Sequence, residues 1–281
     1  MKEFVESNRK FISGVIFTLV LAIVLSILLG ITPSEVLSGT ITVTDRNETE
    51  EIQEKPQETE PEGGTSLKEF LAALPEYDGA HSYAVVNNNI PFFTEEEKEN
   101  TEPFLVYSEL DDLGRAGVAY ANLCCDMFNE GTRKGDLSQI TPSGWHQVNT
   151  RERFGVSLKY EETSTDYLFA RSHLIAWSLG GSELDPRGII TATTGCNLAM
   201  LEVESAVREF LSNARTDHVL YRVTPVYRSS NDLLPYGVLM EGYAVENKGL
   251  FISYNIFVFN AQPELHGVAE IDYETGKVIK P

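Results

Sequence analysis

The chain has 281 residues, of which 42% are hydrophobic and 10% aromatic, so it can form one sizeable core or two small ones. Its formal net charge of −20 excludes the class of proteins that bind nucleic acid through an overall basic surface. The charge is uneven, because residues 1–102 alone carry 7 basic and 19 acidic side chains.

The N-terminal segment has the pattern of a membrane anchor. Residues 1–10 are polar and include basic side chains, and residues 11–31 contain no charge. An apolar run of roughly 20 residues is long enough to cross a bilayer as a helix. No basic residue follows until Arg46, so the positive-inside rule predicts a cytoplasmic N-terminus at 1–10 and a transmembrane anchor at 11–31. The alternative is a cleaved signal peptide, which would leave the remainder secreted.

Residues 32–66 predict a linker. Most of this segment is rich in Glu, Pro and Thr and nearly lacks apolar side chains, so it cannot bury enough surface to offset the loss of conformational entropy. We expect an acidic, disordered tether that places a globular domain, residues 67–281, on the outer side of the membrane.

The domain mixes strand and helix patterns without regular alternation, which predicts an α+β fold with an antiparallel sheet. The predicted elements, in chain order, are a short helix ending at Pro75, a β-rich run with an Asn-rich turn at 81–93, a Gly-containing turn with a strand-like run at 107–128, a turn at 140–148, a strand or hairpin arm at 151–160, an apolar element at 168–181, a strand followed by a turn at 188–197, a helix at 198–214, antiparallel strands at 219–227 and 236–245, a strand at 249–260 and a final hairpin at 270–279.

The helix at 198–214 is the clearest in the domain. Its leucines and valine at positions 198, 201, 207 and 211 are spaced for one apolar face. The three cysteines, by contrast, have no metal-binding spacing and predict buried thiols, with a bridge from Cys196 to Cys124 or Cys125 as the unsupported alternative.

The apolar stretch 168–181 carries Arg171 and His173 and ends in two glycines. A His on a rigid, partly buried element is how a catalytic base is usually held. Taken alone, the stretch is better explained by a core element with one hydrogen-bonded His.

Downstream residues add candidate metal ligands. Asn197 is expected to precede the helix directly, and Glu204 lies two turns along nearly the same face. An amide oxygen and a carboxylate suit a hard cation such as Mg²⁺, and a nearby His could deprotonate the attacking water. The ordinary alternatives are an N-cap role for Asn197 and an i,i+4 ion pair between Glu204 and Arg208.

Residues 133–159 are locally basic despite the acidic chain. This strip could contact the phosphates of a nucleic acid, or it could be an ordinary solvated face. The strip contains the basic residues Arg133, Lys134, Arg151, Arg153 and Lys159.

Several motifs in series resemble the DNA/RNA non-specific endonucleases, the ββα-metal nucleases, and most closely their bacterial secreted and DNA-entry members. The resemblance covers roughly residues 77–281. The motifs are ARSHLIAWSLGG at 170–181, TATTGCN at 191–197 and the helix Glu that follows, together with VVNNNIPFF, LGRAGVAYANL, PSGWHQV and VLYRVTPVY.

The resemblance assigns a role to each matching residue. His173 matches the general base, and Arg171 matches a motif Arg that is structural or faces phosphate. Asn197 matches the direct Mg²⁺ ligand. Glu204 is the best match to the Glu that orients metal-bound water, with Glu202 as a rival, and Arg222 is a weaker match to a phosphate contact.

The sequence also departs from the family pattern. Ala170 stands where the family has Asp or Asn, and Ala192 and Thr194 replace its usual Gly and Arg. The resulting hypothesis is a membrane-anchored or secreted endonuclease that uses Mg²⁺, or Mn²⁺ in its place, to cleave DNA or RNA by contacts with the phosphate backbone. The alternative is a catalytically degenerate domain of the same fold that binds nucleic acid or serves as a surface interaction module.

Overall fold

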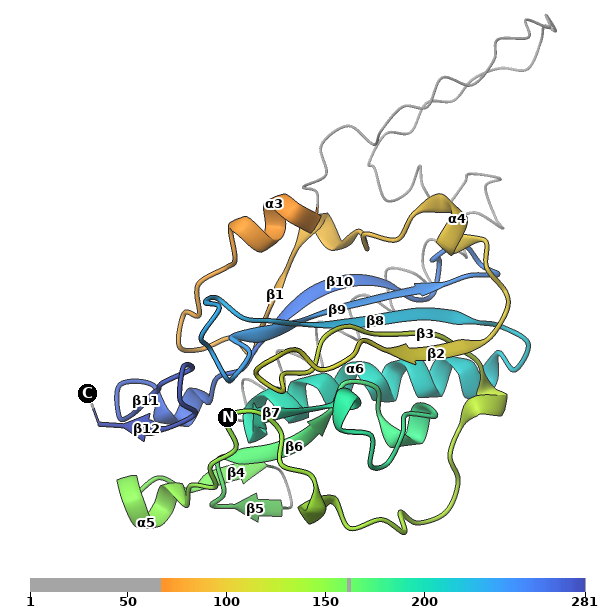
Figure 1. The fold of residues 1–281 in the computed structure, drawn as a ribbon. Coiled ribbons are helices and arrows are strands. Elements are labelled where there is room, and N and C mark those ends of the chain that lie inside the picture. Colours follow the sequence, from red (N-terminus) through yellow and green to blue (C-terminus); the bar gives the residue numbers. More distant parts are fainter. Residues whose placement is uncertain (1–66, 161–162, 281) are drawn as a thin grey trace, which may run out of the picture. The chain divides into compact units, whose positions relative to one another are not determined.

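In the computed structural model of the protein, residues 67–160 and 163–280 are described, and all of them lie in the unit formed by residues 60–281 (Figure 1). The predicted anchor at 11–31 and linker at 32–66 lie outside the described residues. Within the described part, no helix is long and apolar enough to span a membrane.

A six-stranded antiparallel sheet forms the centre of the domain, with strand order β1-β10-β9-β8-β3-β2. The long strands β8 to β10 come from the alternating runs near the C-terminus, so the predicted α+β class with an antiparallel sheet is confirmed. The strands are β1 (Tyr83–Val85), β2 (Phe104–Tyr107), β3 (Ala119–Leu123), β8 (Val219–Val226), β9 (Gly237–Ala244) and β10 (Ser253–Phe259).

Three short hairpins and four helices complete the described structure. The hairpins pair β4 (Leu158–Tyr160) with β5 (Thr163–Thr165), β6 (Phe169–His173) with β7 (Ile189–Thr193), and β11 (Glu270–Ile271) with β12 (Val278–Ile279). The helices are α3 (Leu67–Ala72), α4 (Glu95–Lys98), α5 (Thr150–Phe154) and α6 (Thr194–Asn213). Single 3₁₀ turns occupy Asn87–Asn89, Cys125–Met127, Leu137–Gln139, Trp177–Leu179, Pro186–Gly188 and Pro263–Leu265.

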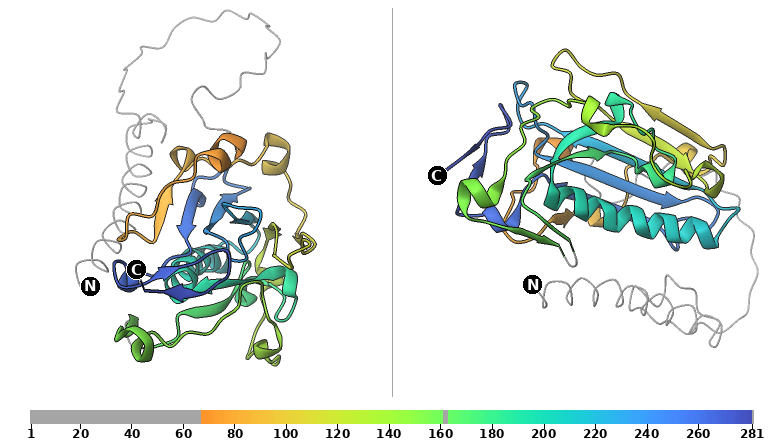
Figure 2. Two further views of the ribbon diagram at one scale, coloured as in Figure 1. Left: turned by 60° about the vertical axis from the view of Figure 1, so that its left-hand side comes forward. Right: turned by 90° about the horizontal axis from the view of Figure 1, so that it is seen from below.

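The β6–β7 hairpin and α6 form a continuous strand–strand–helix unit. Helix α6 runs along one face of the sheet, and the hairpin lies on the side of α6 away from the sheet (Figures 1 and 2). The predicted ββα motif is therefore present, with His173 at the end of its first strand.

The start of α6 corrects one expectation. Thr193 is the N-cap, because its side chain accepts a hydrogen bond from the backbone N–H of Cys196 at 3.0 Å. Asn197 therefore lies inside the first turn of the helix, where it neither precedes nor caps it. This removes the N-cap explanation for Asn197.

The buried face of α6 also differs from the predicted one. Leu201 is 47% exposed, whereas the inner stripe contains a carboxylate. The residues on this stripe are Cys196, Met200, Glu204, Val207 and Leu211, all buried. Val207 and Leu211 lie on the buried stripe as predicted, whereas Leu198 is only partly buried and Leu201 lies outside it, because the buried face is turned toward Cys196, Met200 and Glu204.

Residues 151–160 are only partly a strand. Asn149 caps α5 by accepting from the N–H of Glu152, and Gly155 ends it with a φ of 73° in the left-handed region. Only Leu158–Tyr160 then forms a strand. The three cysteines are free thiols, but only Cys124 and Cys196 are buried as predicted, whereas Cys125 is partly exposed.

The main core lies between α6 and the sheet, and it includes buried side chains from β3, β8, β9 and the 174–179 segment. A second core on the opposite face of the sheet packs α3 against β9 and β10. The segment after His173 is therefore fixed by burial: Leu174, Ile175 and Leu179 are fully buried.

Candidate active site

His173 ends β6 opposite Ile189 of β7 and is 8% exposed. Its Nε2 lies 3.1 Å from the backbone carbonyl oxygen of Glu183. Because a carbonyl can only accept, neutral His173 carries its proton on Nε2 and keeps a lone pair on Nδ1. The imidazole is thus held in the tautomer in which Nδ1 can accept a proton.

The surroundings of His173 keep it neutral. Burial lowers the pKa of His173 below its ordinary 6.5, the hydrogen bond to Glu183 opposes this shift, and the positive charge of Arg133 lowers the pKa further. A base must be unprotonated at the working pH, and these effects favour that state.

Glu204 lies on the inner face of α6 and is 7% exposed. Its Oε1 has no hydrogen-bond partner among the described residues. Burial raises the pKa of Glu204 to about 8, against opposing contributions from a backbone hydrogen bond with Ala176 and from the charge of Arg133. Ala176 lies three residues after His173, so the Glu204 carboxyl group reaches the segment 174–179 that follows His173 in the chain.

The alternatives for Glu204 do not fit the structure. Glu202 is exposed on another side of α6, where its charge acts on Tyr83 of β1. Arg208 donates to the carbonyl of Ser178 and lies 4.4 Å from the ring centroid of Phe128, so it contacts other groups than Glu204. Of the two glutamates, only Glu204 faces the 174–179 segment.

Asn197 is half-buried in the first turn of α6. Its amide forms no hydrogen bond within the described part of the chain. One turn further along, Met200 contacts the Ser172 hydroxyl of β6 at 3.7 Å, so this end of the helix lies against the strand that carries His173. The amide oxygen of Asn197 is consequently available to a ligand.

Arg133 lies in the loop between β3 and α5, and its charge acts on both His173 and Glu204. Its guanidinium is 5.8 Å from the ring centroid of Trp177 and has no ion pair with any described residue. The exposed Lys134 lies beside it. A basic side chain next to an imidazole and a carboxyl group can bind an anionic group such as a phosphate.

Two residues that the sequence did not indicate hold this loop in place. The Asn129 amide donates to the carbonyls of Trp177 at 2.8 Å and Gly181 at 3.1 Å. The Glu183 carboxylate accepts from the Gly135 N–H at 2.8 Å, while its backbone carbonyl binds His173. These contacts join segments about 50 residues apart, so no local pattern could have shown them.

Arg171 acts within the fold. Its Nε donates to the carbonyl of Ile140 at 2.6 Å, and its guanidinium lies 4.0 Å from the ring centroid of Trp145. Of the two roles expected for Arg171, the contacts support the structural one. Ala170, at the departure from the family motif, pairs with Ala192 across the hairpin.

The structure does not bring Arg222 to this site. Strand residues alternate between faces, and Tyr221 faces α6, so Arg222 faces the opposite side of the sheet. There its Nε donates to Glu241 at 2.7 Å, and its guanidinium lies 4.6 Å from the ring centroid of Phe93. The expectation that Arg222 contacts phosphate at the His173 site is therefore not supported by its position.

The other basic residues of the strip, apart from Lys134, lie on different elements from the Arg133 loop. Arg151 and Arg153 are exposed on α5, where Arg151 has one long ion pair of 4.0 Å with Asp166. Lys159 belongs to β4, but its side chain lies outside the described part. Helix α5 lies beside β4, on the same side of the domain as the β6–β7 hairpin (Figure 1).

The donor groups fit a hard cation with few protein ligands. Among the described residues, no group of three or more His, Cys, Asp or Glu side chains could hold a metal ion. Asn197 offers a free amide oxygen, and Glu204 offers a buried carboxyl group that reaches Ala176, three residues after His173. Two oxygen donors with water in the remaining positions match the preference of Mg²⁺.

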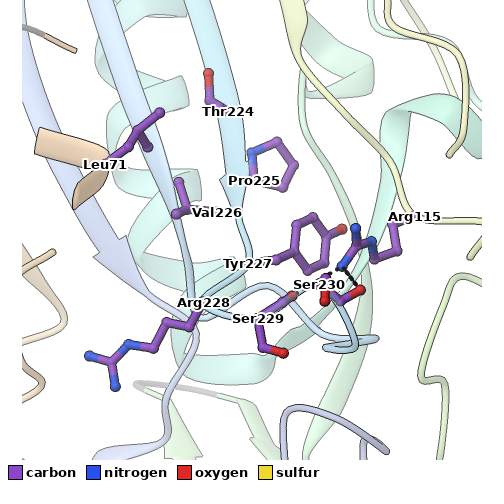
Figure 3. Close-up of a pocket in the computed structure, with 9 residues that line it drawn as sticks. All are labelled: Leu71, Arg115, Thr224, Pro225, Val226, Tyr227, Arg228, Ser229 and Ser230. Carbon is purple, nitrogen blue, oxygen red and sulfur yellow. Dashed lines mark hydrogen bonds between the residues drawn. The ribbon is translucent and has the colours of Figure 1, made fainter. Parts of the chain in front are cut away.

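A surface pocket at the end of β8 is a different feature (Figure 3). Its two arginines already have acidic partners: Arg228 pairs with Glu76 at 2.8 Å, and Arg115 pairs with Asp111 at 2.6 Å. The pocket contains none of the predicted site residues, and we assign it no part in the site.

The ββα unit therefore carries four groups: the imidazole of His173, the buried carboxyl group of Glu204, the amide of Asn197 and the guanidinium of Arg133. Such groups fit a hydrolase that activates water for attack on a phosphate. The sequence profile of the DNA/RNA non-specific endonucleases matches residues 94–245, more than half of the chain. The protein therefore belongs to the DNA/RNA non-specific endonuclease family. Family membership and the nuclease structures below support hydrolysis of nucleic acid as its activity.

Solved nuclease structures share the fold. NucA from Streptococcus agalactiae with magnesium bound has a TM-score of 0.59 and 23% identity, over 76% of this chain and 96% of NucA. The structure of the same protein without metal has a TM-score of 0.58 and 23% identity, over 77% of this chain and 92% of NucA. The structure of Sda1 nuclease with bound zinc has a TM-score of 0.53 and 28% identity, over 63% of this chain and 82% of Sda1. Comparison with curated proteins finds no match.

Proposed function

We propose that the protein is a metal-dependent endonuclease that hydrolyses phosphodiester bonds in DNA, and in RNA as a second substrate, without base preference. One observation carries this proposal. His173 is buried with Nε2 bound to the Glu183 carbonyl, which leaves Nδ1 as a base in the neighbourhood of Arg133.

The residues of the chain have separate tasks in this mechanism. Nδ1 of His173 accepts the proton of the attacking water, and the bond from Nε2 to Glu183 stabilises the resulting imidazolium. Arg133 adds positive charge beside the phosphate, with Lys134, Arg151, Arg153 and Lys159 as further backbone contacts.

Asn197 and Glu204 would hold a divalent cation, for which we propose Mg²⁺, with Mn²⁺ as its substitute. The cation supplies charge stabilisation for the phosphate and the leaving oxygen. The carboxyl group of Glu204, whose pKa burial raises to about 8, becomes a better ligand when ionised, so cation binding and loss of its proton are coupled.

We further propose that the enzyme acts outside the cell, attached to the membrane through residues 11–31 and separated from it by 32–66. Support comes from the uncharged run with basic residues only before it. Secretion after cleavage is the alternative, and immunoblotting of membrane and medium fractions separates the two by location and size.

Plasmid cleavage by the full chain, purified in mild detergent, tests the activity. We expect relaxed and linear products with Mg²⁺ and none with EDTA. His173→Ala should lower the cleavage rate by about 10²–10⁴-fold, the usual contribution of a general base, while the variant still unfolds in a single cooperative transition. Unchanged cleavage by this variant would reject the mechanism.

A matched control is His146→Ala. His146 is exposed, and its Nδ1 lies 3.1 Å from the Gly144 carbonyl oxygen, so its loss should leave cleavage unchanged. Asn197→Ala should abolish the response to Mg²⁺ concentration.

A second candidate function is a degenerate member of the family that binds nucleic acid without cleaving it. The replacement of the motif Asp or Asn by Ala170 favours this candidate. A gel shift without cleavage in Mg²⁺ would support it, and neither a shift nor cleavage would indicate a surface interaction module.

A further inference from the structure

Beneath α6 lie three buried oxygen atoms that have no hydrogen-bond partner among the described residues. They are Oε1 of Glu204 and the hydroxyl oxygens of Tyr221 and Tyr254. An unpaired buried polar atom costs free energy, so three of them in one core require an explanation.

The strand register brings the two tyrosines together. Gly242 of β9 pairs with Tyr254 of β10 on one side and with Tyr221 of β8 on the other. A Cβ atom at Gly242 would lie 2.3 Å from Cε1 and 2.8 Å from the hydroxyl oxygen of Tyr254. The Tyr254 ring therefore lies across β9, in space that only glycine leaves open, and its hydroxyl is directed toward the neighbouring strand.

Glu204 faces this pair from α6. Tyr221 is in the core cluster formed by the inner face of α6, and Tyr254 packs against the same cluster. Burial raises the pKa of both hydroxyls well above 10, and the charge of Glu204 raises both further, as expected for a carboxylate close to each ring.

The three groups are chemically complementary. Each phenol can donate one hydrogen bond, and Oε1 of Glu204 can accept. Because none of them is within bonding geometry of the others, a water molecule is the natural link, and internal waters typically make about three hydrogen bonds to such groups.

We propose that Tyr221 and Tyr254 are positioning residues that hold Oε1 of Glu204 through one internal water molecule. With one oxygen held against the sheet, the other carboxylate oxygen is directed toward Ala176 and the site. The inference rests on the proposed function only where it makes Glu204 a cation-binding group; the link among the three side chains does not depend on catalysis.

A thermodynamic cycle in EDTA tests the link without catalysis, using urea unfolding of the full chain. Tyr221→Phe and Tyr254→Phe should each lower the unfolding midpoint, because each breaks a hydrogen bond of the network. In a Glu204→Met background, the same changes should raise the midpoint, since the hydroxyls have lost their acceptor. Equal shifts in both backgrounds would overturn the proposal.

Tyr77→Phe is the matched control. The hydroxyl of Tyr77 is also buried without a partner, but its ring packs against Phe259 in the core on the opposite face of the sheet. Its removal should shift the midpoint equally in both backgrounds. If the midpoint shift caused by Tyr77→Phe also changed sign in the Glu204→Met background, the sign change would be a general effect of Glu204→Met. The proposed link of Glu204 to Tyr221 and Tyr254 would then be rejected.

Calorimetric titration with Mg²⁺ tests the positioning role. Loss of groups that orient a metal ligand typically weakens binding by about 10–100-fold, so we expect a loss of this size in the double variant Tyr221→Phe/Tyr254→Phe and none in Tyr77→Phe. Unchanged affinity in the double variant would reject positioning. If the unaltered chain bound no Mg²⁺, the proposed function would fail, while the unfolding cycle would still decide the link.

Discussion

Each face of the central sheet buries one glutamate, and the two glutamates differ in how many of their carboxylate oxygens have hydrogen-bond partners. On the face away from α6, Glu241 is fully buried, and both of its oxygens have partners. Its Oε1 accepts from the Phe92 N–H at 2.6 Å and from Nη2 of Arg222 at 3.0 Å, and its Oε2 accepts from Nε of Arg222 at 2.7 Å.

On the α6 face, Glu204 is nearly as buried but has an unpartnered oxygen and a pKa raised to about 8. A fully paired buried charge fixes the NNNIPFF segment onto the sheet. An incompletely paired carboxyl group leaves a desolvation cost in the folded state. The contrast identifies Glu241 as a structural carboxylate and supports the cation-binding role proposed for Glu204.

The largest effect is expected on the structural face. Glu241→Ala removes the closer partner of the partly buried Arg222, which keeps a longer ion pair with Glu97 at 3.5 Å, so we expect a loss of about 3 kcal/mol of unfolding free energy, the lower end of the usual range for breaking a buried pair. Urea unfolding measures it. Glu109→Ala, which removes an exposed partner of Arg187, is the control and should cost less than about 1 kcal/mol. Similar losses of unfolding free energy in Glu241→Ala and Glu109→Ala would show that Glu241 has no special structural role.

The opposite sign is expected for Glu204→Met. In the Tyr221→Phe/Tyr254→Phe background, where no hydroxyl loses its acceptor, replacing the buried carboxyl group by an apolar side chain of similar length should raise the unfolding free energy by roughly 1–4 kcal/mol, while cleavage is lost. A less stable, inactive variant would show instead that Glu204 is structural, like Glu241.

Arg133→Ala should weaken DNA binding by about tenfold and reduce the slope of log affinity against log salt by about 1, because one phosphate contact is removed. Fluorescence anisotropy at several salt concentrations provides this measurement. Arg215→Ala, an exposed basic residue just beyond the C-terminal end of α6, should leave both quantities unchanged.

The smallest effect concerns pH. At Mg²⁺ concentrations that keep Glu204 ionised, the acidic limb of kcat/KM should lie below pH 6.5, because burial and Arg133 lower the pKa of His173, and Arg133→Ala should move the limb upward. The same shift makes the unfolding free energy fall as pH decreases from about 6.5 through the folded-state pKa. An acidic limb above pH 6.5 would contradict the described environment of His173.

Much of the fold was predictable because it depends on local periodicity. The alternating runs at 219–227 and 236–245 predicted β8 and β9, and the predicted hairpin at the C-terminus corresponds to β11 and β12. The same reasoning failed at 151–160, where a capping Asn149 and a left-handed Gly155 produce a short helix. It also placed Leu201 on the buried face of α6.

By itself, the sequence determined the order of the strand–strand–helix unit and the presence in it of His173, Asn197 and Glu204. Alternation likewise showed that Tyr221 and Arg222 face opposite sides of the sheet, but not which side α6 covers. That choice, the docking of the Arg133 loop by Asn129 and Glu183, and the burial of Glu204 against the two tyrosines depend on contacts between distant segments. Only tertiary packing fixes such contacts, because local propensity carries no information about which distant groups meet.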